Sequence, residues 1–437
     1  MSSIMPKENA PKKRLLILAS KLGYQTRGFA ETAETLGVEV VFGTDRCHQL
    51  ENPWGDHALS LHFENPRESA ELIARELHGN PPDAILALGD RPTSAAAYAA
   101  RILRIPGNPP EAVEACRNKL QQREILKAAG IPVPAFFEVS MQDDISQAAS
   151  SAKYPCVLKP LHLAASQGVI RANNSAEFTR AAERIRSLLA SPEIQVLQEP
   201  DAGDLLVEEY IPGKEVAIEG LLEQGALRIL AIFDKPSPME GPYFEETIYV
   251  TPSRLPAGMQ SALEDCAART VRALGLVTGP AHLEFRVNES GPWVLEAAPR
   301  PIGGLCSRVL RFGTARISLE ELLLRHALRL GGCKLEREKA ASGVMMIPVP
   351  RSGIFEGVDG LDAAEAVPGI EELRITARLH DYLAAWPEGS SYLGFIFARG
   401  ESPEEAESAL RSAHARLQLK FSPRLPVQHP VTKRMSS

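Results

Sequence analysis

The sequence predicts an α/β and α+β protein, with a small parallel sheet at its start and mixed strands and helices at its end. Short apolar strands alternate with helical stretches over residues 14–106, which is typical of a doubly wound parallel sheet. Two apolar runs at 281–287 and 293–296 flank a cluster of turn-forming residues and indicate an antiparallel hairpin. From residue 340 onward, three strands and a capped helix indicate an α+β unit.

The composition is that of an ordinary soluble globular protein of two or three domains. The chain has 437 residues, a net charge of -7, 44% hydrophobic and 24% charged residues, which does not favour nucleic-acid binding. Its six cysteines lack C-x-x-C spacing, so we expect reduced thiols rather than a zinc site or a disulfide framework. Residues 1–14 lack an apolar leader, and no run approaches the roughly 18 apolar residues of a membrane span. We therefore expect a cytoplasmic protein without nucleic-acid or membrane partners.

An N-terminal parallel α/β domain is predicted over residues 14–108, after a flexible tail at 1–13. Its expected strands are 15–19, 38–42 and 84–88, and its clearest helix is 66–79, opened by Asn65, Pro66 and Glu68. The first strand is followed by a turn without G-x-G-x-x-G, so dinucleotide binding is not expected. Gly89 and Asp90 end a strand where open sheets bind ligands, although a plain turn is the preferred interpretation.

The next region, 109–335, begins with a predicted helical run at 111–130 that contains Lys119. An apolar strand then ends at Lys159, and the small residues after it include Ser166, Gln167 and Gly168. Backbone N–H groups of such a loop can cradle phosphate oxygens, with the lysine as a point charge. A solvated lysine and an ordinary flexible loop are the alternatives for each motif alone.

A second polar motif follows a predicted helix at 175–190. An apolar strand runs into Glu208, Glu209, Tyr210 and Ile211, and a Pro-Gly turn leads to Glu215. These groups suit a ribose and an adenine amine, although an edge strand with a solvated end is the alternative. Residues 234–252 are predicted to be a long loop that acts as a lid or binding element, followed by a helix at 257–274.

The hairpin has a testable register. Pairing symmetric about Ser290 places Glu284 opposite Glu296. Alternation then gives an apolar face of Leu283, Phe285, Leu295 and Ala297, and a polar face of His282, Glu284, Arg286 and Glu296.

Two facing carboxylates repel unless a cation lies between them. Mg²⁺ is the natural occupant because it takes one or two carboxylates and completes its shell with water and phosphate oxygens. Arg300 follows the second strand and could meet the anion that the metal holds. An exposed hairpin whose acids are merely solvated is the alternative.

The C-terminal α+β domain is predicted over 336–420, with a tail at 421–437. A helix at 318–330 precedes it, and its strands are expected at 343–348, 372–377 and 393–398. Ser402 and Pro403 open its last helix, whose packed stripe is Ala406, Leu410, Ala413 and Leu417.

The ordered set of motifs from Lys119 to Arg300 resembles the ATP-grasp superfamily over about residues 110–305. The stretches 234–254 and 345–353 are similar to L-amino-acid ligases of the bacilysin-synthetase type. The resemblance implies an ATP-grasp fold at 109–335 with a lid at about 134–210, a Rossmann-like domain before it, and the small α+β domain packed on its core.

The same resemblance implies an ATP-dependent ligase that joins a carboxylate to an amine through an acyl phosphate and releases ADP and phosphate. ATP would be held by Lys119, Lys159, Ser166, Gln167, Gly168, Glu208, Glu209, Tyr210, Ile211 and Glu215. Mg²⁺, with Mn²⁺ as a substitute, would be held by Glu284 and Glu296. Arg300 would be catalytic, and the substrates, expected to be amino acids, would meet Arg300, Glu246, His282, Gly303 and Gly304.

One position departs from the family pattern. The superfamily usually reads Glu-x-Asn after the second hairpin strand. In this chain Ala298 stands at the position of that asparagine. The departure leaves a nucleotide-binding regulatory protein open as an alternative, and an ATP-grasp carboxylase that uses bicarbonate is another. A homodimer is also left open.

Overall fold

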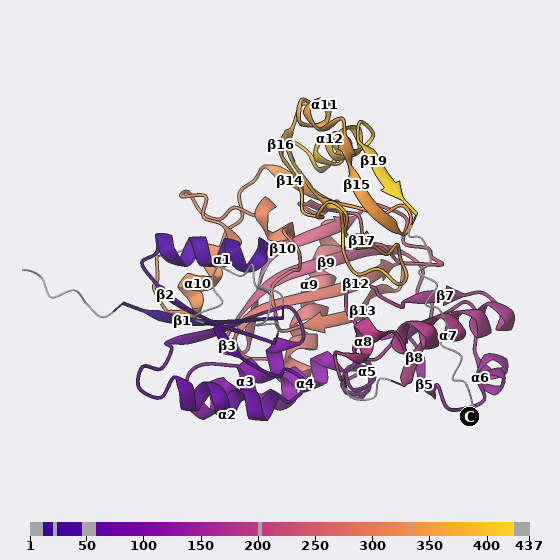
Figure 1. Cartoon of the computed structure of the whole chain (residues 1–437), viewed down its shortest axis with the longest axis horizontal. Helices are drawn as coiled ribbons and strands as arrows, with labels where there is room; N and C mark the ends of the chain where they lie inside the picture. The colour runs from indigo at the N-terminus through magenta and orange to yellow at the C-terminus, as the bar shows by residue number, and fades with distance from the viewer. Residues whose placement is uncertain (1–11, 21–23, 46–57, 200–202, 333, 424–437) are drawn as a thin grey trace, which may run out of the picture.

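The computed structural model describes residues 12–20, 24–45, 58–199, 203–332 and 334–423 (Figure 1). Most of the two predicted tails, part of the first turn, Cys47 and Cys333 lie outside these ranges. Among the described residues, no helix combines the length and apolar character needed to cross a membrane.

The predicted N-terminal parallel sheet is present, with strand order β3-β2-β1-β4. Its strands are β1 (Arg14–Ala19), β2 (Glu39–Thr44), β3 (Ala58–Ser60) and β4 (Ala84–Leu88), and its helices are α1 (Tyr24–Thr35), α2 (Pro66–Glu76) and α3 (Pro92–Leu103). Leu16 and Leu18 pack under α2 and α3, whereas Leu15 and Ile17 belong to a core shared with α1 and with α10 (Leu319–Ala327). The N-terminal sheet is thus joined to the rest of the molecule through buried apolar contacts.

The prediction of one helix over 111–130 was wrong. The segment forms α4 (Pro110–Arg117) and α5 (Lys119–Ala128), and Asn118 between them has extended backbone angles. The Asn118 side chain accepts a hydrogen bond from the backbone N–H of Gln121 at 3.1 Å and so caps α5. This capping bond competes with a continuous helix and sets the direction of the second one.

The predicted lid region forms a separate antiparallel sheet with order β5-β8-β6-β7. Its strands are β5 (Phe136–Ser140), β6 (Cys156–Pro160), β7 (Ile170–Ala172) and β8 (Asp204–Glu209), and its helices are α6 (Ile145–Ser151), α7 (Ser175–Leu189) and α8 (Pro192–Gln195). The stripe predicted for the 175–190 helix is buried in this unit's core. Figure 1 shows the lid as the magenta part of the chain at the side away from β1.

An eight-stranded antiparallel sheet organises the remaining chain, in the order β13-β12-β9-β10-β11-β14-β18-β16. Its strands are β9 (Lys214–Glu223), β10 (Ala226–Lys235), β11 (Ile248–Thr251), β12 (Gly279–Asn288), β13 (Gly291–Ala298), β14 (Ala341–Ile347), β16 (Ile370–Ile375) and β18 (Gly394–Gly400). Helix α9 (Ala257–Ala273) covers one face, where Ile218, Leu283 and Phe285 are buried. The other face carries Ala217 and Phe233 and, by alternation, the polar groups described below.

One expectation about this sheet needs correction. Residues 234–252 are not one long loop, because their end forms β11, which pairs with both β10 and β14. The pairing of Tyr249 with Val344 joins segments far apart in the sequence, so no local signal announces it. The strands predicted at 343–348, 372–377 and 393–398 form β14, β16 and β18, which continue the central sheet.

The C-terminal elements cover the end of the central sheet, at the top of Figure 1. They include a small sheet of order β17-β15-β19 and two helices: β15 (Gly353–Asp359), α11 (Leu361–Glu365), β17 (Tyr382–Leu383), α12 (Pro403–His414) and β19 (Gln418–Ser422). The Ser402 hydroxyl accepts a bond from Glu405 N–H, which confirms the predicted start of α12. A short 3-10 helix, η2 (Cys306–Val309), lies between β13 and α10.

Candidate active site

The β12–β13 hairpin places its acids as predicted. Glu284 pairs with Glu296, and His282 pairs with Ala298. The turn is tighter than expected, because Asn288 pairs with Gly291. A register shift between Glu284 and Phe285 then restores the predicted pairing.

That shift corrects one part of the predicted apolar face. Phe285 pairs with Val294, and Val294 takes the buried position expected for Leu295. Leu295 lies at the bulge, where its carbonyl accepts a hydrogen bond from Arg123. The tighter turn changes the register and the bulge changes it back, so Glu284 and Glu296 still face each other.

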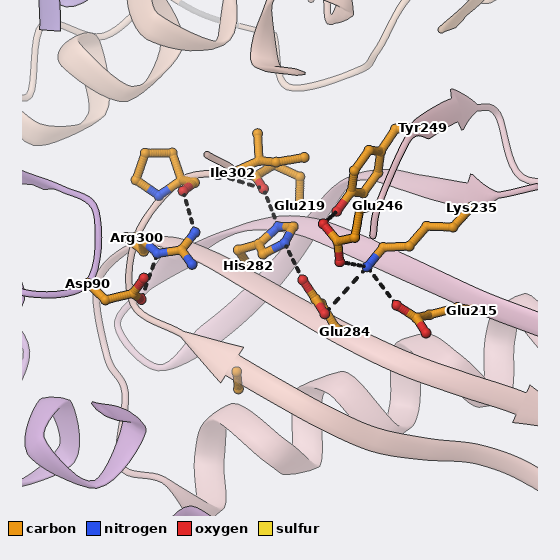
Figure 2. A network of polar contacts seen from close by, with 12 residues as sticks. Asp90, Glu215, Glu219, Lys235, Glu246, Tyr249, His282, Glu284, Arg300 and Ile302 are labelled. Carbon is orange, nitrogen blue, oxygen red and sulfur yellow. Dashed lines mark hydrogen bonds and ion pairs between the residues drawn. The ribbon is translucent and has the colours of Figure 1, made fainter. Parts of the chain in front are cut away.

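Three carboxylates converge on the ammonium of Lys235 at the polar face of the central sheet (Figure 2). Lys235 Nζ lies 2.9 Å from Glu215 Oε1 and 3.4 Å from Glu284 Oε2, and it also contacts Glu246 Oε1. The Tyr249 hydroxyl donates to Glu246 Oε2 at 2.6 Å. These residues come from β9, β10, β11, β12 and the segment before β11, so the cluster exists only in the folded sheet.

The charges in this cluster depend on one another. Burial opposes the charge of Lys235, but the three carboxylates raise its pKa well above the ordinary value. Burial also opposes the charge of Glu284, yet Lys235 and the hydrogen bond from His282 hold the pKa of Glu284 below its usual range. Burial and the neighbouring Glu284 raise the pKa of Glu246. The three carboxylates therefore share the ammonium of Lys235, with Arg286 also contacting Glu215 and His282 also contacting Glu284.

A buried histidine and glutamate adjoin the cluster. His282 Nδ1 lies 3.1 Å from Glu219 Oε2, and His282 Nε2 lies 3.4 Å from Glu284 Oε1. Both oxygens of Glu219 also accept from the backbone N–H of Ile302 at 3.2 Å. Burial lowers the pKa of His282, but the two carboxylates more than compensate and raise it to about 9. His282 is thus a cation at neutral pH, and Glu219 and Glu284 fix its ring.

Arg300 is anchored by the N-terminal domain. Its Nε donates to Asp90 Oδ1 at 2.7 Å, and its Nη1 donates to the carbonyl of Pro301 at 3.1 Å (Figure 2). Burial opposes its charge, but Asp90, Glu296 and Glu284 raise the pKa of Arg300 above its ordinary value. Asp90 therefore does more than form the plain turn that was the preferred interpretation.

The lysines predicted to meet phosphates lie at the junction of α5 and the lid. Lys119 Nζ donates to the carbonyl of Leu163 at 2.6 Å, and Lys159 forms an ion pair with Glu208. Arg123, which is fully buried, holds the other oxygen of Glu208. Burial lowers the pKa of Lys159 against the attraction of Glu208. Burial opposes the charge of Glu208, but Arg123 and Lys159 bring its pKa below the ordinary value.

The predicted phosphate loop contacts the C-terminal part of the chain. Ser166 and Gly168 have positive φ angles of 55° and 73°. Gly168 N–H donates to the carbonyl of Pro387 at 2.9 Å, and the Gln167 amide donates to the carbonyl of Glu388 at 2.7 Å. The backbone N–H of Gly168 therefore donates to an oxygen atom. A phosphate oxygen could accept a hydrogen bond from the same N–H group.

The other predicted site residues are placed as follows. Glu209 is exposed at the end of β8, Ile211 is buried, and the Tyr210 ring lies under the Arg171 guanidinium at 4.0 Å. An added Cβ at Gly303 would meet nothing within 4 Å, whereas at Gly304 it would lie 3.0 Å from Phe395.

The structure thus brings Glu215, Glu246, His282 and Glu284 together. Lys119, on α5, and the pair Lys159 and Glu208 lie together where α5 meets the predicted lid. Arg300 contacts Asp90 of the N-terminal domain. The assignment of these groups to ATP and substrates stays a prediction.

Sequence reasoning missed three residues of the site. Lys235 was placed in a long loop and in the stretch 234–254 that carries the family resemblance, without a role of its own, and Arg123 was one charged residue on a predicted helix. Glu219 is an acid inside the buried run of β9, and a charge within an apolar strand is a signal that could have identified it. The roles of Lys235 and Arg123 depend on partners distant in sequence.

Three carboxylates lie close enough to share a cation, and the Lys235 ammonium lies among them. Carboxylate oxygens of Glu215, Glu246 and Glu284 lie within 4.8 Å of one another. Hard oxygen donors of this kind suit Mg²⁺. Glu296 faces Glu284 across the hairpin but is not part of that group of three.

Comparisons with known proteins agree with this architecture. The ATP-grasp domain matches residues 152–309, and the L-amino acid ligase C-terminal domain 2 matches residues 345–422. The uncharacterized protein y4rH of Sinorhizobium fredii is 28% identical over 334 residues, which cover 74% of this chain and 65% of that protein. Alanine--anticapsin ligase of Bacillus amyloliquefaciens is 27% identical over 301 residues, which cover 64% of this chain and 62% of that protein.

A solved structure extends the agreement to nearly the whole chain. The crystal structure of an L-amino acid ligase from Bacillus licheniformis has a TM-score of 0.80 and 28% identity, covering 95% of this chain and 100% of that one. The predicted ATP-grasp fold is therefore confirmed. In sequence, this chain spans less than two thirds of the length of the two relatives above.

Proposed function

The chain carries an ATP-grasp domain joined to the L-amino acid ligase C-terminal domain 2, and we propose that it is an ATP-dependent ligase that joins two amino acids. The observation that carries this proposal is the meeting of the Glu215, Glu246 and Glu284 carboxylates with Lys235 beside the anchored Arg300. A carboxylate cluster next to fixed cations is what a metal-dependent phosphoryl transfer requires.

ATP would lie between the lid and the central sheet. Lys119 and Lys159 would attract its phosphates, and the loop of Ser166, Gln167 and Gly168 would offer backbone N–H groups. The chain at Glu208, Glu209, Tyr210 and Ile211, together with Glu215, would frame adenine and ribose. Binding requires Lys159 to share its charge between Glu208 and a phosphate, and requires Gly168 N–H to exchange the Pro387 carbonyl for an oxyanion.

Glu284 and Glu296 would hold Mg²⁺, and Mn²⁺, which also prefers oxygen ligands, would substitute. When bound, the ion would neutralise phosphate charge and so favour attack on the γ-phosphorus. His282, charged and fixed by Glu219, holds the carboxylate of Glu284 in place.

The proposed reaction has two steps. A carboxylate oxygen of the first amino acid bonds to the γ-phosphorus as the bond to ADP breaks, which gives an acyl phosphate. The amine of the second amino acid bonds to the acyl carbon, phosphate leaves, and the amine loses a proton. Arg300 supplies positive charge to the acyl phosphate, while Glu246, His282, Gly303 and Gly304 border the amino acids.

Product analysis tests the proposal. Pairwise mixtures of amino acids are incubated with ATP and Mg²⁺, and nucleotide and phosphate are quantified. We expect one ADP and one phosphate per amide formed. Stoichiometric AMP would contradict attack at the γ-phosphorus, and ADP release that requires bicarbonate would favour a carboxylase.

Ala298 favours a second candidate function. A protein that binds nucleotide but has lost turnover would retain the lysines and lack a full set of metal ligands, as the Ala298 position suggests. Nucleotide binding without ADP formation over the whole amino-acid panel would support this regulatory function.

We also propose where the ligase acts and in what assembly. The four described cysteines are free and buried, and the net charge is -7, which suits a cytoplasmic enzyme without a nucleic-acid partner. A homodimer remains a proposal that sedimentation can test.

A further inference from the structure

Asp90 of the N-terminal domain reaches the candidate active site in the central region. It follows β4, and its backbone carbonyl accepts bonds from the N–H and hydroxyl of Thr93 at 3.2 and 2.5 Å. Its side chain does not cap α3, because no side-chain capping bond is present at the start of that helix. The Asp90 carboxylate is therefore free for the 2.7 Å contact with Arg300 Nε.

Arg300 lies between two sets of acids. Asp90 holds its Nε, the Pro301 carbonyl accepts from its Nη1, and its Nη2 forms no hydrogen bond among the described residues. Glu296 and Glu284 attract it electrostatically from the hairpin. The side chains of Arg300 and Asp90 are only 12% and 23% exposed, so solvent screens these interactions weakly.

Loss of Asp90 would leave the guanidinium with Glu219 and the two hairpin acids, Glu284 and Glu296, as charged partners of opposite sign. A buried charge without a partner is costly, so Arg300 would move toward Glu284 or Glu296. An arginine paired with those carboxylates would compete with a divalent ion for the same oxygens. It would also lose the orientation that leaves Nη2 available.

We propose that Asp90 is a positioning residue whose contact with Arg300 keeps the guanidinium away from Glu284 and Glu296, leaving those carboxylates available to a metal ion. The inference rests on the proposed function, because it assumes that the hairpin acids bind the metal. By this inference the N-terminal domain contributes a residue to the site, although that residue lies 210 positions from Arg300 in the sequence.

The test measures Mg²⁺ affinity by calorimetry, with Mg²⁺ titrated into protein saturated with ADP. We expect Asp90→Ala to weaken Mg²⁺ binding by about tenfold, the scale on which the groups that orient a metal site act. Asp90→Asn should fall between Ala and wild type, because its amide oxygen still accepts from Arg300 Nε. Asp83→Asn is the matched control: Asp83 lies at the other end of β4 and accepts from Lys13 and the backbone of Arg14.

A second mutation separates positioning from simple loss of charge. In an Arg300→Gln background no guanidinium can move onto the acids, so Asp90→Ala should change Mg²⁺ affinity by less than about twofold. Equal weakening in both backgrounds would overturn the inference, as would unchanged affinity in Asp90→Ala itself. If wild type shows no Mg²⁺-dependent binding of ADP, the proposed function fails, and this inference fails with it.

Discussion

Replacing Lys235 by methionine removes the ammonium that lies among Glu215, Glu246 and Glu284. The side chain of Lys235 is 2% exposed, so its loss leaves buried carboxylates facing one another. Breaking a buried ion pair by removing one partner costs about 3–5 kcal/mol. Arg286 still contacts Glu215 at 3.0 Å and His282 still contacts Glu284, so we expect the lower value, about 3 kcal/mol of unfolding free energy at pH 8.

The loss should depend on pH. In wild type the pKa of Glu284 is lowered, so its stabilising contribution is present above the ordinary pKa and is lost as pH falls. In Lys235→Met the carboxylates repel, so the pKa of Glu246, already raised in wild type, rises further and Glu284 loses the ammonium that lowers its pKa. The variant then gains stability as pH falls, and the difference from wild type should widen between about pH 5 and 8.

The assay is denaturant unfolding followed by circular dichroism, with EDTA and with Mg²⁺. Mg²⁺ should restore part of the stability of Lys235→Met, by about 2.7 kcal/mol when its concentration is a hundred times the dissociation constant. Lys420→Met is the control, because Lys420 and Asp359 form an exposed pair whose loss should cost at most about 1 kcal/mol. A stability of Lys235→Met equal to wild type at pH 8 in EDTA would refute the charge balance described for the cluster.

Two further predictions concern Ala298, which is buried, and Glu245, which is half-buried. Ala298 pairs with His282 and is expected to leave one ligand position of the metal to water. Ala298→Asn should therefore lower the Mg²⁺ concentration for half-maximal ADP formation, and Ala298→Leu should raise it. An unchanged Mg²⁺ requirement in both variants would mean that residue 298 does not face the ion. Burial raises the pKa of Glu245 to about 7 against a smaller lowering effect of the Val349 backbone. The folded form therefore binds a proton more tightly than the unfolded chain, and stability is lost as pH rises from about 4.5 to 7. After allowance for partial solvent screening, Glu245→Gln should be about 1 kcal/mol more stable than wild type at pH 8 and equal to it near pH 4; a pH-independent difference in chemical denaturation would contradict this.

Local sequence determined the elements whose signals are local. The Ser402 cap and Pro403 begin α12, the apolar spacing of 175–190 gives α7, and turn-forming residues at 288–292 give the hairpin. The facing of Glu284 and Glu296 was also predictable, because strand alternation and one turn set it. Even here the agreement is partly fortuitous, since the shorter turn and the bulge at Leu295 offset each other.

Tertiary structure decided what balances the charges of the site. The sequence indicates that Glu284 needs a cation, but the ammonium that meets it in the folded chain comes from Lys235, which shares the site with Glu215 and Glu246. Lys235 lies 49 positions from Glu284 in the sequence, Glu215 lies 69 and Glu246 lies 38. Only the order of strands β12-β9-β10-β11 brings them together. Asp90 and Arg300, 210 residues apart, meet because the N-terminal sheet packs on the central region through a shared apolar core. Periodicity and capping act over a few residues, whereas electrostatic pairing in a buried site acts through space. The sequence by itself therefore determined which acids needed a partner, and the tertiary structure decided which cations they met.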